Sequence, residues 1–192
     1  MTAPAETAQP RAGLSSTAKL LLMLVLGAAV AVALGVYANQ HTPTGRKPYP
    51  LFFSGMIQLK VWFATLAVAL ACVQLLLAAR LYGKISIPKT APSWLGDAHR
   101  LTGTLTFAVT LPVAYQCLWG LGFETTNTRV VLHGIFGCAF YGAFVIKVLG
   151  VRLKGLPNWV LPVAGGLVFA VLVGVFLTSS VWFFTSSGQA LV

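Results

Sequence analysis

The sequence predicts an all-α integral membrane protein, a bundle of five transmembrane helices. Of its 192 residues, 57% are hydrophobic and only 8% are charged, whereas a soluble domain carries about 25% charged residues because its surface faces water. The apolar residues gather in five long runs, each near or above the roughly 20 residues that a helix needs to cross about 30 Å of hydrocarbon. Because backbone amides have no water partners in lipid, each run must be helical.

The five runs form one transmembrane domain, residues 18–185, with a tail at each end. The expected helices cover about 19–37, 58–81, 101–123, 130–151 and 159–184. Residues 1–17 are polar and small and contain proline, so we expect a disordered tail, and residues 186–192 form a short C-terminal tail. Pro112 and Pro162 lie inside the third and fifth runs, where a membrane helix tolerates proline as a kink or in its first turn.

The first run has two interpretations. Arg11 and Lys19 precede it, and Val36-Tyr37-Ala38 at its end resembles a cleavage site, as in a secretory signal peptide. Its apolar stretch, however, exceeds the roughly 7 to 15 residues of such a signal. We therefore favour an uncleaved first helix.

The basic residues predict how the chain lies in the cell membrane. The net charge is +10, and most Lys and Arg residues lie between the apolar runs. There each contributes about 1 kcal/mol of attraction to anionic lipid head groups, so we expect the lipid bilayer and no nucleic acid as a partner. The positive-inside rule places the side with more basic residues, and with it the N-terminus, in the cytoplasm and the C-terminus outside. The residues of that side are Arg11, Lys19, Arg80, Lys84, Lys89, Arg100, Lys147, Arg152 and Lys154.

Small residues at a spacing of four predict where the helices touch. Lipid provides no hydrophobic drive between helices, so close backbone contact must supply the attraction. Such faces are Gly27, Ala31 and Gly35 in the first run, Gly134, Cys138 and Gly142 in the fourth, and Gly166, Ala170 and Gly174 in the fifth. They predict a tight bundle, and further membrane subunits or a second copy of the chain stay open as partners.

Polar groups within membrane helices are functional-site candidates by default. The candidates are His99, His133, Gln74, Gln116, Lys60 and Lys147, with Asp97 and Arg100 at the inner boundary. Lys60 and Lys147 lie near helix ends, so we expect them to snorkel to the interface. Asp97 is expected to cap the third helix.

His133 is the main candidate among these residues. It lies about one turn inside the fourth run, and Gln116 lies at a similar depth in the third. The turn between the two runs is short, so the helices should be antiparallel neighbours and the two side chains could share a hydrogen bond, worth roughly 0.6 kcal/mol in a membrane. The functional alternative is that His133 binds an iron porphyrin, a quinone or a proton.

Geometry limits the haem hypothesis. His99 starts the third run inside and His133 starts the fourth run outside, roughly 25 to 30 Å apart along the membrane normal, so they cannot ligate one iron. A bis-histidine site at His133 would need His41 from the outer loop, and His99 could take Met23.

Two segments carry a family resemblance. The stretches DAHRLTGTLTFAVTLPVAYQCLWGLGF (97–123) and RVVLHGIFGCAFYGAFVIKVLGVR (129–152) resemble a group of uncharacterised bacterial membrane proteins. Through His99-Arg100-x-x-Gly103 and His133-Gly134 the chain also resembles b-type cytochromes of the cytochrome b561 and ferric-reductase kind. That resemblance covers the second to fifth runs and implies haem b, with His99 and His133 as metal ligands. Gln116 stands where the cytochromes would carry the histidine that faces His133.

Three functions follow as alternatives: a membrane electron-transfer protein with a b haem or quinone at His133, His99 and Gln116, a non-catalytic accessory or assembly subunit of a membrane complex, and a small-solute transporter. Few ionisable residues lie at mid-membrane, which disfavours transport.

The sequence has no Gly-rich phosphate loop and no Gly-x-Ser-x-Gly elbow. Asp97 and Glu124 fall on opposite sides of the membrane, so they cannot pair for acid–base catalysis, and we assign no catalytic residue.

Overall fold

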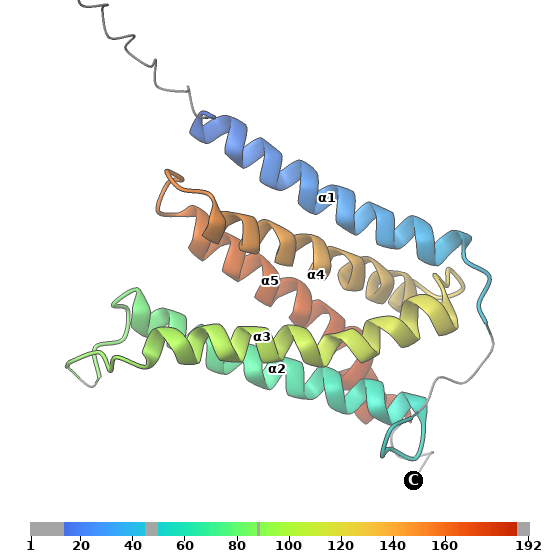
Figure 1. The fold of residues 1–192 in the computed structure, drawn as a ribbon. Helices are drawn as coiled ribbons and strands as arrows, with labels where there is room; N and C mark the ends of the chain where they lie inside the picture. The colour runs from blue at the N-terminus through green and yellow to red at the C-terminus, as the bar shows by residue number, and fades with distance from the viewer. Residues whose placement is uncertain (1–13, 45–49, 88, 188–192) are drawn as a thin grey trace, which may run out of the picture.

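The computed structural model describes residues 14–44, 50–87 and 89–187, and this part of the chain is helical apart from its loops (Figure 1). Five of its helices are long and apolar enough to cross a membrane, which confirms the expected fold class. They are α1 (Ser16–Gln40), α2 (Met56–Leu81), α3 (Leu95–Tyr115), α4 (Thr128–Arg152) and α5 (Val160–Phe176). Three π-helical segments extend them: η1 (Gln116–Leu121) follows α3, and η2 (Leu177–Val181) and η3 (Phe183–Ser187) follow α5.

Four helices begin earlier than their apolar runs, α2 and α4 by two residues each and α1 and α3 by more. The Ser15 side chain caps α1 by accepting a hydrogen bond from the Ala18 amide at 3.2 Å, so residues 16 and 17 belong to the helix and not to the expected tail, of which 1–13 lie outside the described residues. α3 begins at Leu95 and includes the polar residues 97–100. The apolar pattern marks the boundary of the lipid, whereas the helix continues into the head-group region.

The expected role of Asp97 also changes with this boundary. Trp94 occupies the N-cap position of α3 and makes no side-chain cap. Asp97 lies one turn further on, and its carboxylate forms an ion pair with Arg100, which is also exposed. In the first turn it still complements the positive end of the helix dipole.

The helices run antiparallel along one axis (Figure 1). α1 packs on α4, α4 packs on α5, and α2 packs on both α3 and α5. We name the two ends of the bundle by residues in their loops. The Glu124 end holds the α1–α2 and α3–α4 loops and the last described residues, and the Arg152 end holds the α2–α3 and α4–α5 loops.

The contact between α1 and α4 is made by the small residues that the sequence singled out. A Cβ added at Gly142 would lie 2.5 Å from the Gly27 carbonyl oxygen and 3.0 Å from Ala31 Cβ, and one added at Gly35 would lie 3.9 Å from Cys138 Sγ. The small-residue face of α1 therefore packs directly against the small-residue face of α4, as close backbone packing in lipid requires. In α5 only part of the predicted packing face makes contact. The Phe136 ring packs against Gly174, whereas no atom lies within 4 Å of a Cβ added at Gly166.

Large aromatic side chains fill the space between α3 and α4. The Phe107 and Phe144 rings stack with centroids 4.3 Å apart, and Phe140 packs edge-on against Tyr141 at 5.2 Å. We call Phe107, Phe140, Tyr141 and Phe144 the aromatic layer. The Tyr141 hydroxyl lies within hydrogen-bonding distance of the Thr110 backbone oxygen, at 3.2 Å, and of its Oγ1, at 3.1 Å, so the layer ties the two helices together at mid-membrane.

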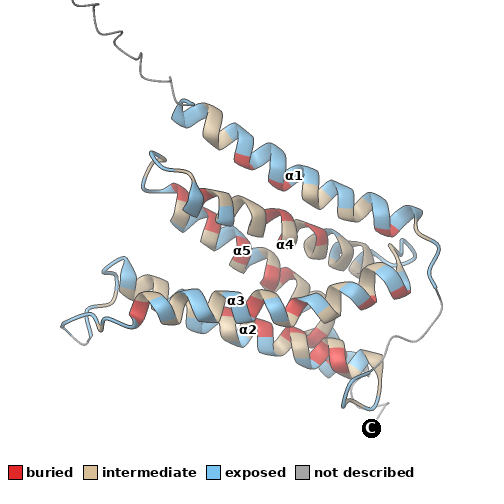
Figure 2. Ribbon diagram, viewed as in Figure 1, coloured by how far each residue is buried: buried red, intermediate tan, exposed pale blue. Residues whose placement is uncertain are grey.

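The outer faces of the helices suit a hydrocarbon solvent. Figure 2 shows buried residues only on the inward faces, and α1 is exposed along most of its length. The tryptophans lie near both ends of the bundle and are exposed: Trp62, Trp119 and Trp182 at the Glu124 end, and Trp94 and Trp159 at the Arg152 end. This is the arrangement of interfacial aromatic belts.

The glycine contact can be tested by adding one methyl group. We expect Gly142→Ala to lower the free energy of unfolding by roughly 1–3 kcal/mol, because the new Cβ meets the rigid Gly27 carbonyl. Thermal unfolding of the detergent-solubilised protein measures this. Gly166→Ala adds the same methyl group where nothing lies within 4 Å and should change stability little; equal losses in both variants would refute the α1–α4 contact.

Candidate functional site

A cavity of about 320 Å³ lies between the helices in the half of the bundle nearest the Glu124 end. Its walls are mostly apolar, and the aromatic layer contributes Phe140 and Tyr141. The side chains with polar atoms that line it are Lys60, Thr110, Cys117, Glu124, Arg129, His133, Cys138, Tyr141, Ser179 and Trp182. Apolar walls with a few convergent polar groups are characteristic of small-molecule sites, which hold about 300–1,000 Å³, so this cavity is the candidate functional site.

All three π-helical segments contribute to the wall of this cavity, η3 through Phe183. Pro112 lacks an amide hydrogen, and α3 passes into η1 four residues later, where the Gln116 amide bonds to both the Pro112 and Val113 carbonyls. η1 presents Cys117 and Leu118 to the cavity, and η2 presents Ser179. Wider turns of this kind are frequent at functional sites because they change which side chains face inward.

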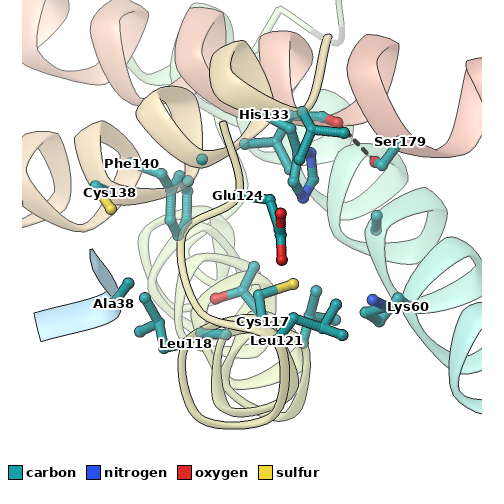
Figure 3. Close-up of a pocket in the computed structure, with 18 of the residues that line it drawn as sticks. Ala38, Lys60, Cys117, Leu118, Leu121, Glu124, His133, Cys138, Phe140 and Ser179 are labelled. Atoms are coloured by element: carbon teal, nitrogen blue, oxygen red, sulfur yellow. Dashed lines mark hydrogen bonds between the residues drawn. The ribbon is translucent and has the colours of Figure 1, made fainter. Parts of the chain in front are cut away.

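Polar groups from separate elements meet in the cavity (Figure 3). The His133 ring of α4 and the Glu124 carboxylate of the α3–α4 loop point into the same space, with Cys117 of η1 and Lys60 of α2 across it. Arg129 is held at the rim, since its guanidinium donates to the Thr178 carbonyl at 2.6 Å and lies 3.8 Å from the centre of the Trp182 ring.

The hydrogen bonds around His133 determine its tautomer. His133 Nδ1 lies 3.2 Å from Thr178 Oγ1. The Thr178 hydroxyl has one proton, and its oxygen lies 2.7 Å from the Gly174 carbonyl and 3.1 Å from the Val175 carbonyl. We therefore infer that this oxygen accepts from His133 and that the ring proton is on Nδ1. In the neutral ring Nε2 is then left with a free lone pair. A partner that fixes one ring nitrogen in this way orients the other toward a ligand.

His133 therefore bonds to a different helix from the one expected. The sequence suggested Gln116 in the third run, but the hydrogen bond of the described ring nitrogen goes to Thr178 in η2. Gln116 is only 2% exposed, and it is not among the described residues that line the cavity. α4 packs directly on α5, whereas α3 faces α4 across the aromatic layer, which explains the change of partner.

His99 lies near the opposite end of the bundle from His133. Its backbone carbonyl accepts from Gln74 Nε2 at 3.1 Å, and the same Gln74 side chain is within 3.4 Å of Lys147. Lys147 is fourteen residues from His133 in α4, about 21 Å along the helix. His99 and His133 cannot share one metal ion, as the sequence analysis predicted.

The structure does not bring His41 close to His133 or Met23 close to His99, the other pairs considered as haem ligands. The His41 ring stacks on Tyr37, with centroids 5.1 Å apart, and contacts the Trp119 ring at a tilt, with centroids 4.9 Å apart. It lies outside the described cavity lining. Met23 is buried against Gly150 of α4, while His99 contacts α2. Within residues 14–44, 50–87 and 89–187, no group of three or more His, Cys, Asp or Glu side chains could hold a metal ion.

The sequence alone did not indicate a role for Glu124 and Cys117, which line the cavity, or for Thr178, which bonds to His133. Thr178 and Cys117 were hidden because a threonine or cysteine in an apolar run usually serves packing or bonds its own helix. Glu124 lies in the short segment between two apolar runs, where a charged residue usually belongs to a solvated loop. The signal that could have identified it is its rarity, since the chain has 3 acidic residues and this one adjoins two helices that carry polar candidates.

Comparison with known proteins places the chain in a family. A family described as "Family of unknown function (DUF6529)" matches residues 20–191, a range that contains α2 to α5 and all but the first turn of α1. No curated protein and no solved structure matches the chain significantly.

The tautomer of His133 can be observed directly. In ¹⁵N spectra of histidine-labelled protein, we expect one ring to be neutral with its proton on Nδ1, and we expect Thr178→Val to change that pattern because the acceptor is lost. Thr185→Val, which removes a hydroxyl bonded only within its own helix turn, is the matched control. A His133 ring protonated on Nε2 in the unmodified protein would contradict the assignment.

Proposed function

The chain belongs to the DUF6529 family, whose function is unknown, and we propose from its geometry that it binds the ring of a lipid-soluble quinone in the cavity at the Glu124 end and serves membrane electron transfer. The observation that carries this proposal is the orientation of His133. Thr178 holds the Nδ1 proton, so the Nε2 lone pair is available as an acceptor at the wall of an apolar cavity.

The cavity walls suit a planar ring. Phe63, Phe140 and Trp182 are among the aromatic side chains that line it, and aromatic faces and edges pack favourably against a flat ligand. At about 320 Å³ the cavity lies at the small end of the range for ligand sites, which favours a single ring over a porphyrin. Apolar helix faces around it can accommodate an isoprenoid tail.

The polar groups suit both redox forms of such a ring. A quinol has two hydroxyl protons to donate, and His133 Nε2 and the Glu124 carboxylate are acceptors. A quinone has only carbonyl oxygens, and the Lys60 ammonium group is a donor. Each redox form therefore has a partner of the opposite kind in the same cavity.

The proposed reaction balances with an external electron acceptor. Oxidation of a quinol to a quinone breaks two O–H bonds and releases two protons and two electrons. His133 Nε2 accepts one proton and the Glu124 carboxylate accepts the other. The two electrons pass one at a time to a one-electron redox protein that docks at the Glu124 end.

A b haem is the second candidate, favoured by the same observation. An imidazole whose Nδ1–H is hydrogen-bonded and whose Nε2 is free is the form that ligates haem iron. His133 would be the ligand on one side, and Cys117 and Cys138 are soft donors among the other lining residues. The resemblance to b-type cytochromes supports this alternative, whereas the volume of the cavity and the lack of a second histidine in its described lining disfavour it.

Quinol binding to purified protein tests the proposal. We expect a short-chain quinol to quench the fluorescence of Trp182, which lines the cavity, and we expect His133→Leu to weaken binding about tenfold, because a hydrogen bond to a buried group is worth roughly 1–3 kcal/mol. His41→Leu removes a histidine outside the described lining and should bind like the unmodified protein. Equal weakening in both variants would contradict the role of His133.

An absorption spectrum of the same sample separates the alternatives. A Soret band with sharp α and β bands on reduction, lost in His133→Leu, would replace the quinone by haem. A folded, colourless sample that does not bind quinol would reject both the quinone site and the haem site. The hypothesis of an accessory subunit would then remain.

A further inference from the structure

Lys147 points its charge into the membrane and not toward the nearest interface. It lies five residues before the end of α4 at Arg152, about 7.5 Å inside the helix end. Helical side chains lean toward the N-terminus, which for α4 is the direction of the membrane centre. The Nζ atom lies 3.4 Å from Gln74 Oε1 in α2, and Gln74 is seven residues from the end of its own helix. The snorkelling that the sequence suggested is not observed.

Gln74 and His99 complete a polar cluster around this lysine. Gln74 Nε2 donates to the His99 carbonyl at 3.1 Å, and its amide lies directly over Gly103, where any Cβ would collide with it. We call Lys147, Gln74 and His99 the Lys147 cluster. His99 Nδ1 is buried and has no hydrogen-bond partner within the part of the chain that the structure describes. Buried polar atoms of this kind normally have a partner, in protein, water or ligand.

No described carboxylate balances the charge of Lys147. Asp97 is paired with Arg100, and both side chains are exposed. Glu124 is at the opposite end of the bundle. The described contact of the Lys147 ammonium group is the neutral amide of Gln74. A charge within the membrane is costly unless it is compensated. The Arg152 end also carries the exposed basic residues Lys84, Arg152 and Lys154, so the whole end attracts anions.

We propose that the Lys147 cluster binds the phosphate of an anionic phospholipid from the leaflet at the Arg152 end. In Figure 1 the α2–α3 pair and the α4–α5 pair spread apart toward this end, and the Lys147–Gln74 contact bridges them. Lys147 supplies the charge, and the His99 ring supplies a second polar group. Basic sites between transmembrane helices on the more basic side of a protein are known to receive lipid phosphates.

A lipid explains the depth of the cluster better than a free anion does. A free phosphate would have to leave water to reach a lysine about 7.5 Å inside the helix end. A phospholipid already holds its phosphate at the membrane interface, where the flexible Lys147 side chain reaches it by turning from Gln74 toward the helix end. The lipid tails then lie along the exposed apolar faces of the bundle.

Native mass spectrometry of the full chain tests the proposal. The delipidated protein is mixed with equal amounts of phosphatidylglycerol and phosphatidylcholine, and the ratio of the two bound lipids is measured. We expect a preference for phosphatidylglycerol that falls at least about fivefold in Lys147→Met and persists in Lys147→Arg. Lys154→Met removes an exposed charge at the same end and should lower the ratio much less.

A second variant tests the mechanism without removing the lysine. Gln74→Glu places a carboxylate within reach of Lys147, so the charge is balanced internally and the preference for phosphatidylglycerol should fall as it does in Lys147→Met. The proposal is overturned if Lys147→Met and Lys154→Met lower the ratio equally, which would show a diffuse surface attraction, or if Gln74→Glu leaves it unchanged. Displacement of phosphatidylglycerol by millimolar inorganic phosphate would overturn the lipid assignment in favour of a free-anion site.

Discussion

Hydrocarbon offers no partner to a backbone amide, and this constraint governs the structure from end to end. Each span must satisfy its own amides and carbonyls, so each is a helix. Since lipid does not drive helices together, the bundle coheres where backbones approach closely. The contact of Gly27 with Gly142 brings α1 against α4, and Gly103 admits the Gln74 amide between α2 and α3. The described departures from regular α-helix are η1, η2 and η3, and all three border the cavity.

The same constraint separates two polar regions of different character. At the Glu124 end, His133, Glu124 and Lys60 surround a cavity, and both donors and acceptors are present. At the Arg152 end, the Lys147 cluster has a cation and an amide but no described acid other than Asp97, which is already paired. The first arrangement suits a neutral ring that changes its number of protons, and the second suits an anion. The cavity at the Glu124 end and the Lys147 cluster therefore suit ligands of different charge.

Much of the fold was predictable because its main determinants are local in sequence. Span length and apolarity follow from bilayer thickness, and the spacing of Gly27, Ala31 and Gly35 identified the packing face of α1. The positions of His99 and His133 at opposite ends followed from helix rise alone.

The partners within the site were not predictable, because they depend on which helices touch. Sequence order suggested that α3 is the neighbour of His133, since a short turn joins them. The structure instead separates α3 from α4 by aromatic rings and packs α4 on α5, so Thr178 and not Gln116 receives the bond. The direction of Lys147 depended in the same way on the presence of Gln74 across the helix gap. No pattern within one helix contains this information.

The aromatic layer closes the cavity on the side that faces the Arg152 end of the bundle. Phe107 and Phe144 are stacked, and Tyr141 is tied to Thr110, between His133 and the Lys147 cluster. The described lining of the cavity includes Phe140 and Tyr141 of this layer but not Phe107 or Phe144. Under the proposed function, a proton that His133 gains or loses would exchange with the aqueous compartment at the Glu124 end. Chemistry in the cavity would follow the acidity of that single compartment and would move no charge across the bilayer.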